Sequence, residues 1–179
     1  MPTTAFLLAW QTFYFILATA AATLAGLLFV GLTFSAGVVK GDVFRLVRIW
    51  VEPLLLDYIQ VLGLGAIAVM PDLTPTGLGV ALLVLWVWRA WRYFEVLKHF
   101  KGMGEKSDLE ASDWVELAIL PGLLLALLVA AGAGFLLGQA WAPLTLAVNV
   151  LGTLLLTVYN TWTQWVWMLA EKAKDPKKK

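Results

Sequence analysis

Long apolar stretches, separated by short polar or glycine- and proline-containing segments, organise this chain. The stretches lie at about 5–36, 49–70, 76–96, 114–137 and 142–168. A hydrocarbon core about 30 Å thick requires roughly 20 consecutive apolar residues per helix, and the stretches reach that length. The pattern therefore predicts an all-α fold, a single domain over residues 1–179 built as a polytopic bundle of about five transmembrane helices.

The connections between these stretches differ in length. The turn around residues 71–75 is very short, so we expect the second and third helices to be antiparallel neighbours. A longer loop, 97–113, separates the third helix from the fourth. Apart from Pro121 and several glycines, the fourth stretch is almost featureless, and we expect it to face lipid.

Positive charge is distributed unevenly along the chain. All thirteen Lys and Arg residues fall in or beside the connections after the first and third helices, or in the basic tail 171–179. The N-terminus and the turns at 71–75 and 138–142 hold none. Basic residues stay on the cytoplasmic side of a membrane and attract anionic lipid there. We therefore expect the N-terminus outside, the C-terminus inside, and loop 97–113 in the cytoplasm.

Composition narrows the possible chemistry. Hydrophobic residues make up 61% and charged residues 14%, against about 25% charged in soluble proteins. There is no Cys and only one His, His99, so disulfides and sites with several imidazole or thiolate ligands within one chain are excluded. We expect no metal, no cofactor and no nucleic-acid partner. No nucleophile–base motif or phosphate-binding glycine loop is present, so no catalytic residue is predicted.

A stripe of polar residues follows the fifth predicted helix. At about 100° per residue its members fall on one face of the helix. They are Thr145, Asn149, Thr153, Thr157, Asn160 and Gln164. Polar side chains in hydrocarbon need hydrogen-bond partners. Three interpretations stay open: a hydrogen-bonded seam inside the bundle, the lining of a water-filled path, or a contact between subunits.

Four ionisable residues lie within the second and third predicted helices. Glu52 and Asp57 belong to the second helix, and Arg89 and Arg92 to the third. Since the two helices run antiparallel, matched depths would place Asp57 near Arg89 and Glu52 near Arg92. Unpaired charge at this depth is costly, so pairing is expected. The pairs could simply fix two helices together, or they could form a gate, a proton relay or a ligand site.

Small residues recur on one face of the first predicted helix. Ala18, Ala22 and Gly26 are spaced four residues apart, and such spacing lets two helix backbones approach closely. Close packing within the chain and a subunit contact are both possible. The helix itself lacks a basic leading region and exceeds the usual signal-peptide length, so we expect it to be retained.

The first helix also carries a recognisable pattern. Trp10-Gln-Thr-Phe13-Tyr14, followed by Leu24-Ala-Gly26-Leu-Leu-Phe29-Val30, resembles the opening of small uncharacterised bacterial multi-pass membrane proteins. Some of these carry names implying modulation of a membrane-bound AAA protease. The resemblance covers one helix, implies a bacterial origin, and assigns no functional residue.

The leading hypothesis is a homo-oligomeric channel or passive transport protein of the bacterial inner membrane, with the polar stripe lining its path. One alternative is a non-catalytic accessory or regulatory subunit of a larger membrane complex. A further alternative is an intramembrane lipid-modifying enzyme, which would require a pocket around Asp57 open to lipid. The expected partners are the bilayer, anionic lipid at the cytoplasmic face, and either further copies or a membrane-complex partner.

Overall fold

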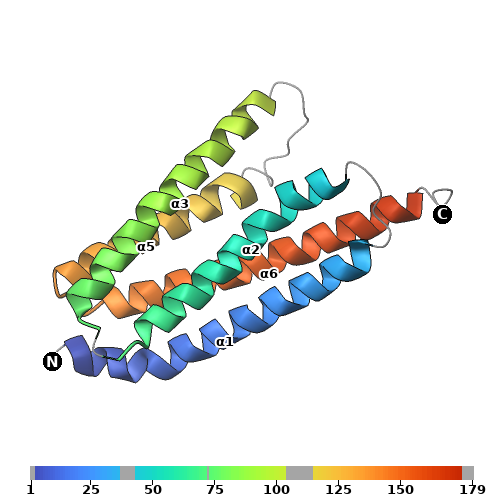
Figure 1. The fold of residues 1–179 in the computed structure, drawn as a ribbon. Helices are drawn as coiled ribbons and strands as arrows, with labels where there is room; N and C mark the ends of the chain where they lie inside the picture. Colours follow the sequence, from blue (N-terminus) through green and yellow to red (C-terminus); the bar gives the residue numbers. More distant parts are fainter. Residues whose placement is uncertain (1–2, 37–42, 72, 104–114, 175–179) are drawn as a thin grey trace.

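A computed structural model describes residues 3–36, 43–71, 73–103 and 115–174. Over this part of the chain the fold is helical and contains no strand (Figure 1). The helices are α1 (Thr3–Ala36), α2 (Val43–Ala68), α3 (Pro75–Met103), the π-helical turn η1 (Val115–Ile119), α5 (Leu120–Leu136) and α6 (Ala142–Lys174). The all-α class predicted from the sequence is confirmed.

Three of these helices are long and apolar enough to cross a membrane. Their apolar segments are Ala9–Thr33 in α1, Val51–Ala68 in α2 and Ala142–Val166 in α6. α5 is shorter, and the apolar first half of α3 is followed by Arg89 and Arg92. By length and composition, this chain is therefore suited to the membrane.

The helices form a bundle with α6 at its centre. α1 packs along α2, α3 packs along α5, and α6 contacts α5, α2 and α1. The N-terminus, the turn between α2 and α3, and the turn between α5 and α6 lie at one end of the bundle. The C-terminus and the end of α1 lie at the other end (Figure 1).

The expectation that α2 and α3 pack as neighbours was wrong for most of their length. A short turn does join them, but α3 leans away from α2, contacts it at few positions and packs along α5 instead (Figure 1). Gly79 on α3 shows how close the α3–α5 approach is. A Cβ atom at this position would lie 2.9 Å from the carbonyl oxygen of Gly132. Since a short turn restrains only the helix ends, this contact determines where the rest of α3 lies.

The fourth helix, which we expected to face lipid, has one side buried in the bundle and one side exposed. Leu128, Ala131 and Phe135 of α5 are buried in the bundle, whereas Leu123 is exposed. α5 is preceded by η1, a single π-helical turn. Pro121 explains this irregular start, because it has no N–H to donate to the carbonyl one turn earlier.

α1 is held to the bundle by a close backbone approach and a buried hydrogen bond. A Cβ atom at Gly65 of α2 would lie 2.7 Å from the Cβ of Ala18, so only glycine fits this contact. The fully buried Tyr14 hydroxyl donates a hydrogen bond to the carbonyl of Pro143, at 2.7 Å. These contacts join α1 to both α2 and the start of α6.

Candidate functional site

An ion pair joins α2 to α3 where the two helices otherwise have few contacts. The Arg89 guanidinium donates a hydrogen bond to the Asp57 carboxylate. Both charged side chains are about one-fifth exposed, at 23% for Arg89 and 21% for Asp57. The pair therefore links α2 to α3 and is partly accessible rather than enclosed in the core.

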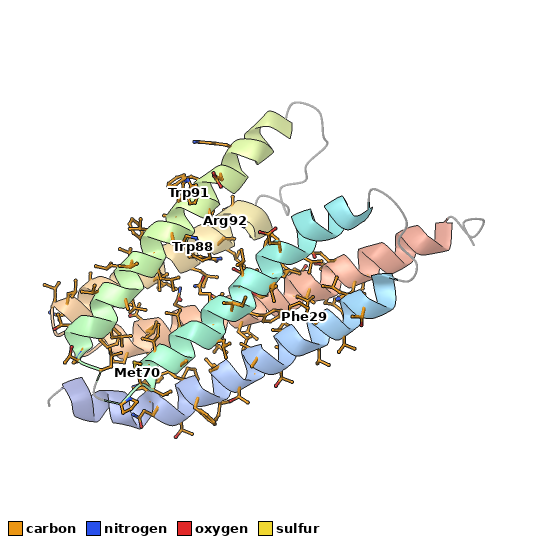
Figure 2. The ribbon with its side chains drawn as sticks, viewed as in Figure 1. Phe29, Met70, Trp88, Trp91 and Arg92 are labelled. Carbon is orange, nitrogen blue, oxygen red and sulfur yellow. The ribbon has the colours of Figure 1, made fainter. Side chains whose placement is uncertain are left out.

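The other expected pairing is not seen. Among the residues that the structure describes, no ion pair joins Glu52 to Arg92. Figure 2 shows Arg92 on the side of α3 turned toward the rest of the bundle, and Trp91 on its outer side. Arg92 thus lies near the Asp57–Arg89 pair while making no ion pair with a described acidic residue.

The centre of the α6 polar stripe is buried inside the chain. Asn149, Thr153 and Thr157 are 1%, 2% and 1% exposed. The Asn149 amide nitrogen donates to the Leu124 carbonyl of α5 at 2.6 Å, and the Thr157 hydroxyl donates to the Thr153 carbonyl at 2.7 Å. This part of the stripe faces α2 and α5, not the outside of the bundle.

The two ends of the stripe are less enclosed. The Thr145 hydroxyl donates to the Trp141 carbonyl at 3.2 Å. Asn160 and Gln164 are half-buried, and the side-chain oxygen of Gln164 has no partner among the described residues. Beside the stripe, the Thr161 hydroxyl lies 3.1 Å from that of Tyr58 on α2.

A cavity with both apolar and polar lining residues lies between α2, α3, α5 and α6. Its volume is about 160 Å³, room for several water molecules or one small polar group. Leucines and prolines of α2 and α5 form its apolar walls. Its polar lining residues are Asp57, Gln60, Arg89, Arg92, Tyr93, Asn149 and Thr153. The structure thus brings the ion pair and the middle of the α6 stripe into one site.

The mouth of the cavity lies between α2 and α3. Pro53 of α2 and Trp88 of α3 line the cavity and are also exposed at the surface. Figure 2 shows Trp88 on α3 one helical turn before Arg92. These two exposed lining residues indicate that the cavity is open on the side between α2 and α3.

Three buried polar atoms around this cavity have no hydrogen-bond partner among the described residues. They are the side-chain oxygens of Gln60, Asn149 and Thr153. A buried polar group without a partner costs about 1–3 kcal/mol. Such groups are retained where water or a ligand supplies the missing hydrogen bond. The arrangement is therefore suited to holding a polar guest.

Gln60 and Tyr93 were not predicted as site residues. Gln60 lies in the apolar part of α2 one turn after Asp57. A single amide side chain in such an apolar segment could have indicated a site residue. The Tyr93 hydroxyl donates to the Ala118 carbonyl of η1 at 2.7 Å. That role depends on how α3 meets η1, and no pattern in the sequence indicates it.

The small-residue face of α1 is divided. Ala18 is buried against α2, whereas Ala22 and Gly26 are exposed, and a Cβ atom at Gly26 would meet nothing within 4 Å. Only the first of the three residues packs within the chain.

Comparisons with known proteins give no relative for this chain. No family model, no curated protein and no solved structure matches it.

Proposed function

We propose that this chain is a five-pass inner-membrane protein that lets a small polar group pass through the membrane by way of a cavity inside each chain. The observation that carries this proposal is the burial of the central α6 stripe around a cavity with an ion pair and three unpartnered polar atoms. Passive transport requires polar groups at membrane depth that can replace part of a solute's hydration.

The arrangement of charge supports the five-pass topology. The end of the bundle with the N-terminus and both short turns carries no Lys or Arg. α5 packs along α6, a helix long enough to span, and α3 packs along α5, which supports a membrane crossing by α3 and α5 as well. Positive charge confined to the other end supports an N-terminus outside and a C-terminus in the cytoplasm.

The burial of the stripe favours a path within one chain over a pore between copies. Asn149 and Thr153 already face other helices of the same chain, so an axial pore would require α6 to turn outward. A homo-oligomer fits this proposal as an assembly in which every copy contains its own cavity.

Two alternatives each have one supporting observation. An accessory subunit would use the stripe as a packing seam, and the hydrogen bonds of Asn149 and Thr157 fit that role. A lipid-modifying enzyme would require an open pocket around Asp57, and the cavity has one. The lining of this cavity contains one carboxylate, that of Asp57, which is already paired with Arg89.

Blocking the cavity tests the proposal. In liposomes containing the protein we expect glycerol entry, or exchange of a headgroup-labelled phospholipid between leaflets, to exceed that of empty liposomes. Thr153→Trp fills the cavity and should abolish the excess. Leu155→Trp is the matched control, since Leu155 is 60% exposed on the outer face of the same helix. Wild-type liposomes that pass neither probe would contradict a transport function.

A further inference from the structure

The two walls of the cavity differ in chemistry. On the α2 and α6 side, the unpartnered atoms are the side-chain oxygens of Gln60, Asn149 and Thr153. The orientation of Asn149 is fixed, because its amide nitrogen donates to the Leu124 carbonyl and its oxygen is left as an acceptor. Amide oxygens only accept hydrogen bonds, and a threonine hydroxyl can accept one as well. This wall therefore suits a guest that carries N–H or O–H donors.

The α3 wall suits an anion. Two guanidinium groups, Arg89 and Arg92, line the cavity against one carboxylate, Asp57. Arg89 is engaged by Asp57, and Arg92 makes no ion pair with any acidic residue that the structure describes. A guanidinium presents its donors in a planar fork that matches phosphate oxygens. The cavity can thus hold a phosphate at one wall and hydrogen-bond donors at the other.

The position of the mouth indicates where such a guest comes from. Asp57 lies six residues from Val51, the first residue of the apolar segment of α2, which is roughly 9 Å along the helix. The exposed Trp88 and Trp91 of α3 (Figure 2) lie within two residues of Arg89, the ion-pair partner of Asp57. Tryptophan is enriched where headgroups meet hydrocarbon. A sideways opening at this depth faces the leaflet at the C-terminal end of the bundle.

We propose that the cavity binds a phosphate ester whose far end carries hydrogen-bond donors, supplied as a phospholipid headgroup of that leaflet. Phosphatidylethanolamine fits, with its phosphate at Arg92 and its ammonium at the Gln60, Asn149 and Thr153 oxygens. Phosphatidylglycerol fits with hydroxyls in place of the ammonium. Phosphatidylcholine has the same phosphate but no N–H or O–H donor. The inference rests on the proposed function, because it names the class of group that enters the cavity.

Native mass spectrometry of the purified protein can test this selectivity. Phosphatidylethanolamine, phosphatidylglycerol and phosphatidylcholine with identical acyl chains would be added separately at equal concentration. We expect the first two to bind about tenfold more tightly than phosphatidylcholine, or more, because the latter leaves the acceptor wall unpaired. Equal binding of all three lipids would overturn the proposal.

Variants separate the two walls. Arg92→Gln should lower the affinity for all three lipids, because each of them carries the phosphate. Thr153→Val is nearly isosteric and should narrow the difference between phosphatidylethanolamine and phosphatidylcholine. Lys98→Gln, an exposed residue further along α3, is the matched control and should change nothing. Unchanged lipid affinity in folded Arg92→Gln, or an unchanged difference between phosphatidylethanolamine and phosphatidylcholine in folded Thr153→Val, would also overturn the proposal.

Soluble phosphate esters distinguish the source of the ligand. Phosphoethanolamine and glycerol phosphate carry the same groups without acyl chains. If they bind as tightly as the lipids and show the same dependence on Arg92, the phosphate-ester chemistry stands and the lipid source is wrong. If the protein binds these lipids selectively but transports nothing, the proposed transport function is wrong and the proposed lipid site stands. If Thr153→Trp blocks transport but the protein shows no selective lipid binding, the proposed lipid site is wrong and the proposed function stands.

Discussion

Asp57 and Arg89 hold α3 to α2 across an interface with few other contacts. We therefore expect that breaking the pair lowers the free energy of unfolding substantially. Removing one partner of a buried pair leaves the other charge stranded. Both side chains are about one-fifth exposed, so we expect the lower end of the known range, about 3 kcal/mol, for Asp57→Ala.

A double-mutant cycle measures this coupling. Asp57→Ala combined with Arg89→Ala should recover part of the lost thermal stability, because no unpaired charge then remains. Arg92→Ala is the control, since Arg92 makes no ion pair with a described residue. Strictly additive losses for Asp57 and Arg89 would show that the pair does not stabilise the bundle.

The contact between α3 and α5 depends on the absence of a side chain at Gly79. Gly79→Ala should destabilise the protein by about 1–3 kcal/mol, because its Cβ would approach the Gly132 carbonyl oxygen too closely. Gly26→Ala on α1 meets nothing within 4 Å and should be neutral or slightly stabilising, by up to about 1 kcal/mol. Thermal melts of both variants test this contrast, and equal effects would mean that the α3–α5 approach is not tight.

Helix boundaries could be predicted from the sequence because apolar length, glycine, proline and charge set them locally. The first stretch was expected at about 5–36 and α1 is Thr3–Ala36; the fifth was expected at 142–168 and α6 begins at Ala142. Helix pairing could not be predicted in the same way. A short turn between α2 and α3 says nothing about the close approach of Gly79 to Gly132, two residues more than fifty positions apart.

The candidate site was predictable only in parts. The Asp57–Arg89 contact follows from matched depths in two antiparallel helices, and the stripe on α6 follows from its spacing. The ion pair and the stripe line the same cavity only because α3 tilts away from α2 and the polar face of α6 points inward. Tertiary packing sets both of these orientations. The same dependence explains why Ala18 packs within the chain while Gly26 does not.

At the scale of the whole molecule, the segregated charge, the buried polar stripe and the partly open cavity support the proposal of a membrane protein whose transport path lies inside each chain. The central claim is that a polar group from outside the protein reaches the middle of α6. The chain has no native Cys, so a single introduced thiol reports on one position.

Cysteine reactivity at Thr153 tests this claim most directly. Membrane vesicles would be treated with small methanethiosulfonate reagents, with single cysteines at Thr74 and Lys98 marking the two sides of the membrane. Thr153→Cys should react, and faster with an anionic than with a cationic reagent, because Arg92 lines the same cavity. Leu155→Cys, on the exposed outer face of α6, should not react if that face contacts lipid as proposed. An unreactive Thr153→Cys in a folded protein would contradict the account and make the stripe a packing seam.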